Sequence, residues 1–210
     1  MQALVPPPFL QGDKAMAEAA ARASGSRRFV AGNALYIADP ARMQASLLVG
    51  HTLTQVAIKA ERADLPVGVA LALFADEAIG PNSLRDAMQR EWYGAWLDLA
   101  RHDDFVGVQN YKRWRWNDKG RVNPPHLSTF NTMGSEIYPP SLANAVRYAH
   151  AVTRRPVLIT EHGLCTDRDG LRASFIPAAL AELGRAIGDG VPVLGYMHWS
   201  LIDTYEWIFG

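Results

Sequence analysis

The sequence has 210 residues, of which 49% are hydrophobic and 20% charged, and Lys plus Arg equals Asp plus Glu at 21 each. This composition is typical of a globular domain with a sizeable core, and it excludes a disordered chain. A neutral chain creates no general field that would attract nucleic acid or an anionic membrane surface, so we expect neither partner.

Cysteine and histidine usage limits the chemistry further. The single cysteine, Cys165, excludes an internal disulfide framework and favours a reducing compartment. No apolar run is long enough for a transmembrane helix, and the first residues lack the pattern of a signal peptide. We therefore expect a cytoplasmic protein. The six histidines show no metal-ligand spacing and no glycine-rich nucleotide loop occurs, so we expect no metal and no cofactor.

Four short apolar runs alternate with helical patterns along the chain. Residues 1–40 indicate an irregular region with one short helix near 15–23, and Asp39 with Pro40 predicts a helix start that continues to about residue 62. The predicted strands are 67–73, 105–108, 157–160 and 191–198, and the predicted helices between them are 83–100, 140–152 and 173–188. The first strand is expected to be buried on both faces, and the segment after the second is expected to be a long loop.

Strands that alternate with helices predict βαβ units and a parallel sheet, so we predict an α/β fold. A segment of a barrel suits the pattern better than a nucleotide-binding sheet does. We expect residues 1–210 to form a single partial barrel domain, in which 1–40 are irregular and 41–210 hold the βα units.

The carboxyl ends of barrel strands are where functional residues gather. Glu161 directly ends an apolar run, so a charged side chain is expected at the carboxyl end of a buried strand. A lone glutamate at a strand end is structural more often than catalytic. Glu161 is nevertheless a stronger candidate for a catalytic residue, because polar and aromatic residues lie at or just beyond neighbouring strand ends, namely Tyr111, Trp199, Glu206 and Trp207.

Four motifs then resemble glycoside hydrolase family one, the β-glucosidase-like enzymes. Residues 157–163 (VLITEHG) are similar to that family's I-T-E-N-G strand, and residues 199–207 (WSLIDTYEW) to its W-S-L-x-D-N-F-E-W segment. Residues 104–111 (DFVGVQNY) resemble its D-F-I-G-x-N-Y-Y strand, and residues 136–139 (EIYP) its W-E-I-Y-P segment. All four occur in the family's order. The resemblance implies about the last four βα units of a TIM (β/α)8 barrel.

The resemblance also implies roles for individual residues. Glu161 would be the nucleophile of a retaining β-glycosidase, and Tyr111 would orient its carboxylate. The sugar would be bound by a set of polar and aromatic side chains, namely Gln109, Trp199, Glu206 and Trp207. The carboxylate of Glu206 would repel a sugar phosphate, so the implied substrate is an unphosphorylated β-glycoside or oligosaccharide.

Departures from the family pattern leave alternatives open. Gln109 and His162 both stand where the family has Asn. His162 could raise its own pKa and lower that of Glu161, or it could face away from the site. Residues 112–116 (KRWRW) mix basic and aromatic residues, but we expect Trp114 and Trp116 to line the leaving-group side of the sugar site rather than to bind nucleic acid.

The family's acid/base motif, T-x-N-E-P, does not occur in the sequence. We therefore expect a chain truncated before that half of the barrel, with doubtful activity by itself. The open edge strands of such a half-barrel also predict self-association. Two alternatives stay open: a non-catalytic sugar-binding pseudoenzyme or fragment that needs a partner half, and an unrelated α/β domain whose motif matches are accidental.

Overall fold

The structure is a computed structural model that describes residues 15–16, 18–27 and 40–204. The chain divides into two compact units, residues 1–56 and 57–210. Residues 18–23 of the first unit are helical. Helix α3 (Pro40–Glu61) begins in the first unit and ends in the second. The predicted helix from Pro40 is confirmed, although none of its residues is buried, and the predicted N-cap Asp39 lies outside the described residues.

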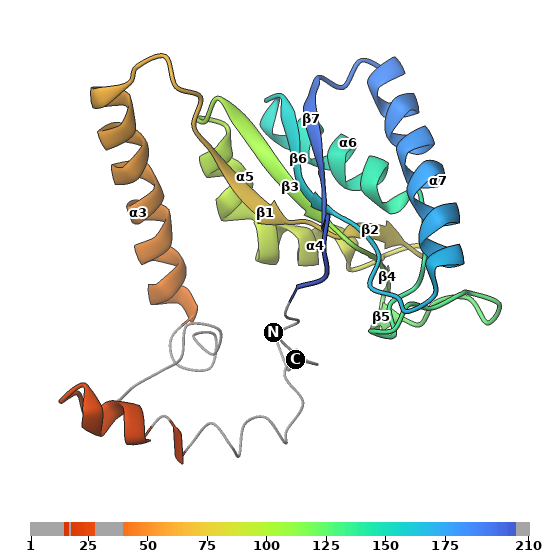
Figure 1. Ribbon diagram of the computed structural model, residues 1–210, viewed down its shortest axis with the longest axis horizontal. Coiled ribbons are helices and arrows are strands. Elements are labelled where there is room, and N and C mark those ends of the chain that lie inside the picture. The colour runs from red at the N-terminus through yellow and green to blue at the C-terminus, as the bar shows by residue number, and fades with distance from the viewer. Residues whose placement is uncertain (1–14, 17, 28–39, 205–210) are drawn as a thin grey trace. The chain divides into compact units, whose positions relative to one another are not determined.

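A four-stranded parallel sheet in the order β1-β3-β6-β7 organises the second unit (Figure 1). Its strands are β1 (Gly68–Ala72), β3 (Phe105–Asn110), β6 (Val157–His162) and β7 (Val193–His198). Each neighbouring pair is parallel. The four predicted strands and the parallel sheet are confirmed, and the fold is α/β as expected.

Helices connect consecutive strands and pack against the sheet. The first connection is a continuous helical segment of α4 (Arg85–Gln89), the π-helical turn η2 (Arg90–Gly94) and α5 (Ala95–Ala100), and the next two are α6 (Ser141–Thr153) and α7 (Asp169–Gly188). In α6 the buried side chains Leu142, Ala145, Val146 and Ala149 recur at helical spacing and form one apolar stripe. This stripe joins a core with alternate residues of the central strands, Val106 and Val108 of β3 and Val157 and Ile159 of β6.

A second, smaller sheet extends the parallel sheet beyond the carboxyl ends of β1 and β3. It contains β2 (Ala75–Ala78), β4 (Arg113–Asn117) and β5 (Gly120–Val122) in the order β2-β4-β5. The predicted long loop after residue 108 is therefore wrong. The basic and aromatic residues of β4 do not show an ordinary strand pattern in the sequence, because the glutamates that neutralise their charges and several of the rings that pack on them are distant along the chain.

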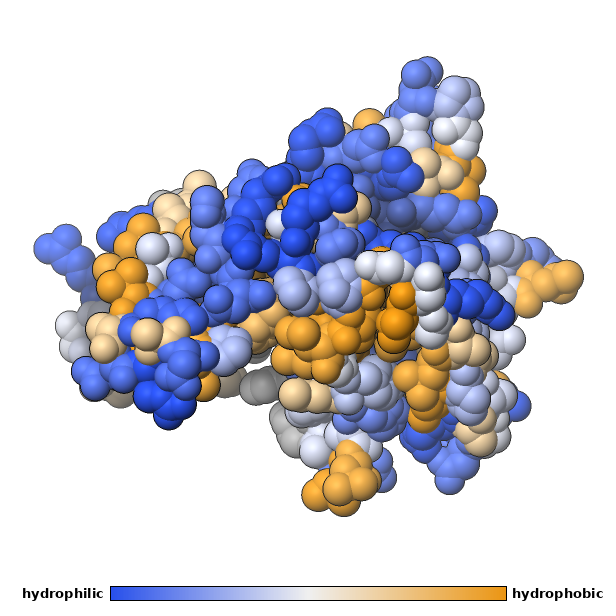
Figure 2. Space-filling model, turned by 90° about the horizontal axis from the view of Figure 1, so that it is seen from above, coloured by the Kyte–Doolittle hydropathy of each residue, from blue (hydrophilic) through white to orange (hydrophobic). Residues whose placement is uncertain are grey.

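Helices cover one face of the sheet, and each of its edge strands carries exposed side chains. In β1 the side chains of Ala70 and Ala72 are exposed, and the expected burial of this strand on both faces is wrong. In β7 the large apolar side chains Leu194 and Met197 are 59% and 54% exposed. Figure 2 shows a patch of hydrophobic residues bordered by hydrophilic ones. Within the described parts of the chain, no helix has the length and apolar character required to span a membrane.

Candidate active site

The carboxylate of Glu161 is held by two donors from the neighbouring strand. Gln109 and Glu161 are register partners on β3 and β6, next to an irregularity in the pairing. The amide Nε2 of Gln109 donates to Oε1 of Glu161 at 2.9 Å, and the hydroxyl of Tyr111 donates to Oε2 at 2.8 Å. Each carboxylate oxygen therefore accepts one hydrogen bond, which fixes the orientation of the group at the carboxyl edge of the sheet.

The remaining residues predicted for the site lie at the carboxyl end of β7. The backbone N–H of Trp199 donates to the carbonyl oxygen of His162 at 2.9 Å, which ties this segment to the end of β6. The Trp199 side chain is 51% exposed. Glu206 and Trp207 lie outside the described residues. The structure thus brings Gln109, Tyr111 and Glu161 together, while the roles assigned to all of these residues remain predictions.

A close approach of backbones joins the ends of β6 and β7 beside Glu161. A Cβ atom added at Gly163 would overlap the carbonyl oxygen of Trp199. No side chain can be accommodated there without moving one of the two strand ends. The glycine of the VLITEHG segment is therefore required by the packing of the candidate site.

His162 faces the opposite side of the sheet from Glu161, because successive side chains of a strand alternate. Its side chain is fully buried and stacks on Phe175 of α7, with ring centroids 5.2 Å apart. Burial, together with the charge that His198 can carry, lowers the pKa of His162 to about 4. Of the two alternatives left open by the sequence, a raised pKa is wrong, and the residue faces away from the candidate site.

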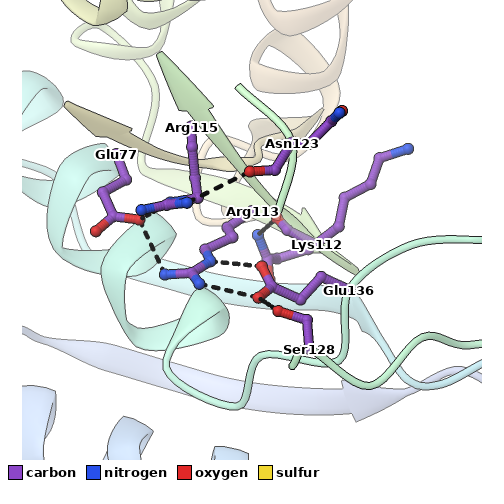
Figure 3. A network of polar contacts seen from close by, with 8 residues as sticks. Glu77, Lys112, Arg113, Arg115, Asn123, Ser128 and Glu136 are labelled. Atoms are coloured by element: carbon purple, nitrogen blue, oxygen red, sulfur yellow. Dashed lines mark hydrogen bonds and ion pairs between the residues drawn. The ribbon is translucent and has the colours of Figure 1, made fainter. Parts of the chain in front are cut away.

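An ion-pair network around Arg113 lies just beyond the strand ends, and sequence reasoning missed it (Figure 3). The Arg113 guanidinium donates to both oxygens of Glu136, at 2.6 and 2.9 Å, and to Glu77 at 2.9 Å. Ser128 donates a further hydrogen bond of 2.6 Å to Glu136. Burial opposes ionisation of Glu136, but these hydrogen bonds outweigh it and hold its pKa below the ordinary value. Two signals for it were present in the sequence, the EIYP segment that contains Glu136 and the KRWRW segment that contains Arg113, but nothing in the sequence links them.

The two tryptophans of β4 belong to an aromatic cluster. Trp116 is 6% exposed and its ring lies 5.4 Å from that of Trp92, while Trp114 packs on Phe74 at 4.4 Å. Trp116 also donates its indole N–H to Asp76 at 2.7 Å. The expectation that Trp116 lines a sugar site is therefore wrong, because its ring is inside the packing between β4 and the first connecting helix.

Asp76 is the most perturbed carboxyl group near the strand ends. It borders a pocket of about 80 Å³, whose lining residues are Ala75, Asp76, Glu77, Arg113, Tyr138 and Asn144. Burial raises the pKa of Asp76 to about 6, against the opposing effect of the Trp116 hydrogen bond. Among the described residues, no group of three or more His, Cys, Asp or Glu side chains is placed to hold a metal ion.

The fold and the site define a class of protein: an α/β barrel segment with a hydrogen-bonded acid at the end of a central strand. The model of glycosyl hydrolase family 1 matches residues 98–210. The chain belongs to this family.

Relatives and solved structures agree with this assignment. The β-galactosidase of Sulfolobus acidocaldarius is 29% identical over 128 residues, which cover 54% of this chain and 26% of that protein. The 1,4-beta-D-glucan glucohydrolase of Thermotoga neapolitana is 29% identical over 141 residues, 60% of this chain and 33% of that protein. An apo β-glucosidase structure superposes with a TM-score of 0.82 at 29% identity, over 92% of this chain and 47% of that one.

The chain spans less than half of that β-glucosidase and a quarter to a third of the two named relatives. The expected partial barrel is thereby confirmed as the fold class.

Proposed function

We propose that the chain carries the nucleophile half of a retaining β-glycosidase that hydrolyses unphosphorylated β-glycosides, with Glu161 as the nucleophile. The observation that carries the proposal is the pair of hydrogen bonds that Gln109 and Tyr111 donate to the two oxygens of Glu161. A nucleophilic carboxylate must be held in one orientation towards the reacting carbon, and two donors from a rigid strand end do this.

In the proposed reaction an oxygen of Glu161 attacks the anomeric carbon of the bound sugar. The bond from this carbon to the leaving oxygen breaks, and that oxygen takes a proton from a carboxylic acid. A water molecule then attacks the same carbon, gives its proton to the resulting carboxylate and releases Glu161. Tyr111 and Gln109 position the Glu161 carboxylate in both steps.

The second carboxyl group must stand roughly 5 Å from the nucleophile in a retaining enzyme. The donors that reach Glu161 are an amide and a phenol, neither of which is an acid of suitable strength. We propose that the acid/base is supplied by a barrel strand other than β1, β3, β6 and β7. Residues 41–210 then act as the βα units of one partial barrel domain.

The resemblance of residues 199–207 to a sugar-binding segment supports the substrate class. Trp199 and Trp207 are proposed as aromatic walls against the C–H faces of a pyranose, and Glu206 as an acceptor for its hydroxyl groups. A relative named aryl-phospho-beta-D-glucosidase, from Bacillus subtilis, is 34% identical over 94 residues. The carboxylate of Glu206 favours an unphosphorylated sugar over a sugar phosphate by simple charge repulsion.

The test uses a β-glucoside with a 2,4-dinitrophenolate leaving group, which needs little assistance from an acid. We expect Glu161→Gly to abolish release of the phenolate, and added azide to restore it with formation of α-glucosyl azide, because the small anion attacks where the carboxylate is missing. The control is the unsubstituted protein with azide, which should yield no α-azide. Retained turnover in Glu161→Gly without azide would remove Glu161 as the nucleophile.

A further inference from the structure

Behind the candidate site, on the face of the sheet opposite to Glu161, three side chains form a hydrogen-bonded chain. Nδ1 of His162 lies 2.9 Å from the hydroxyl of Tyr196, and this hydroxyl lies 3.1 Å from Nδ1 of His198. His162 directly follows Glu161 on β6, and His198, the last residue of β7, directly precedes Trp199. The Tyr196 hydroxyl therefore links His162, which is the neighbour of Glu161, to His198, which is the neighbour of Trp199.

The positions of the protons in this hydrogen-bonded series of side chains follow from the available donors and acceptors. The Tyr196 hydroxyl has one proton, so it donates to one imidazole and accepts from the other. Nε2 of His162 is buried without a partner. Because a buried N–H with no acceptor is rare, the proton of neutral His162 belongs on Nδ1. Tyr196 then accepts from His162 and donates to Nδ1 of His198, whose own proton is on Nε2.

His162 is suited to act as a neutral donor in this arrangement. Its ring is fully buried, stacked on Phe175, and its pKa is lowered to about 4 by burial and by His198. The groups that face it are the Tyr196 hydroxyl, the His198 imidazole and the uncharged Phe175 ring. Its backbone carbonyl also accepts the N–H of Trp199 at 2.9 Å.

We propose that His162, Tyr196 and His198 form a positioning relay of fixed tautomers, which holds the Glu161 end of β6 in register with the Trp199 end of β7. His162 and His198 are register partners in the sheet, but the pairing between them and Ile159–Tyr196 is irregular. Side-chain hydrogen bonds add to the backbone pairing at this point. The effect of the relay on catalysis rests on the proposed role of Glu161. The relay itself does not depend on that role.

The test reads tautomers and exchange, neither of which needs turnover. In protein with ¹⁵N-labelled histidine, long-range ¹H–¹⁵N correlation spectra at pH 8 should show His162 protonated on Nδ1 and His198 on Nε2. Tyr196→Phe keeps the ring but removes the hydroxyl. We expect it to erase the tautomer preference of His198 and to speed hydrogen exchange at the Trp199 amide by about tenfold, the loss of about 1.4 kcal/mol of local stability.

Two further variants separate the relay from simple packing. In His162→Asn the side-chain amide can still donate to Tyr196, so we expect His198 to keep its tautomer. In His162→Ala this donor is missing, and we expect His198 to lose its tautomer preference. If Tyr196→Phe leaves both the His198 tautomer and Trp199 exchange unchanged, the hydroxyl has only a packing role and the relay is refuted. Those outcomes leave the assignment of Glu161 untouched, because that assignment is tested by turnover and by covalent capture of the nucleophile.

Discussion

Glu161 accepts hydrogen bonds from an amide and a phenol that both belong to the end of β3. The sequence predicted this contact only through a resemblance, since nothing in the spacing of Tyr111 and Glu161, 50 positions apart, requires it. The parallel pairing of β3 and β6 provides the physical reason, because it places the carboxyl ends of the two strands side by side.

Tyr111→Phe tests the contribution of the phenol. The variant keeps the ring and removes the donor at 2.8 Å from Oε2 of Glu161, so we expect the rate of phenolate release from the 2,4-dinitrophenyl β-glucoside to fall roughly 10- to 100-fold with an unchanged melting temperature. Tyr138→Phe is the matched control, because its ring beneath the Arg113 guanidinium is retained. A smaller loss in Tyr111→Phe than in the control would contradict the proposed role.

Asp76 predicts a pH dependence of stability. Its pKa of about 6 in the folded protein lies above the ordinary value of 3.8. The folded state therefore binds more protons than the unfolded chain in this window, and stability falls as pH rises through it. Asp76→Asn cannot ionise and still accepts from Trp116. We expect it to be more stable than the parent by about 1–2 kcal/mol at pH 7.5 and similar near pH 4, measured by urea unfolding.

The exposed Asp98 supplies the control for this measurement, since its side chain is 73% exposed. Asp98→Asn should change stability little at either pH. If Asp76→Asn were less stable than the parent at pH 7.5, the buried carboxylate would be a stabilising group, and its raised pKa would be wrong.

At the scale of elements, the regular parts of the fold could be predicted and the second sheet could not. The apolar runs of β1, β3, β6 and β7 are continuous or nearly so, which is typical of strands in a parallel sheet. The sequence of β4 (RWRWN) alternates basic and aromatic residues instead. Its burial depends on Glu77 and Glu136, which lie 36 and 23 positions from Arg113, so no local pattern predicts it.

The network that holds β4 predicts a difference between two glutamates that bind the same arginine. Glu136 and Arg113 have side chains that are 6% and 10% exposed, whereas Glu77 is 43% exposed. Loss of one partner of a buried pair leaves an uncompensated charge and costs about 3–5 kcal/mol, while exposed pairs contribute about 0–1 kcal/mol. We expect Glu136→Gln to lower the urea midpoint strongly and Glu77→Gln to change it little. Equal shifts would show that burial does not govern this network.

At the scale of the whole molecule, the parallel sheet carries exposed apolar side chains on strands that are outermost among the described residues. β1 and β7 are the outer strands of the sheet, and Leu194 and Met197 of β7 are more than half exposed. Edge strands and apolar faces of this kind favour association. The expected self-association remains a prediction.

Light scattering tests this prediction. We expect the 210-residue chain in isolation to form dimers or larger species, and Leu194→Lys to reduce their fraction by placing a charge beside the edge strand. Ile187→Lys on α7 is the matched control, since Ile187 is 49% exposed but belongs to a helix and not to the edge strand. A monodisperse, cooperatively melting monomer of the parent chain would contradict the prediction.

Covalent capture of the nucleophile tests the central claim most directly. A 2-deoxy-2-fluoro-β-glucosyl fluoride slows hydrolysis of the glycosyl intermediate, and its fluoride leaves without help from an acid. Incubation with the chain, proteolysis and mass spectrometry should yield one added fluoroglucosyl group, on the peptide that contains Glu161. No adduct in the parent chain, or the same adduct in Glu161→Gln, would contradict the assignment of Glu161 as the nucleophile.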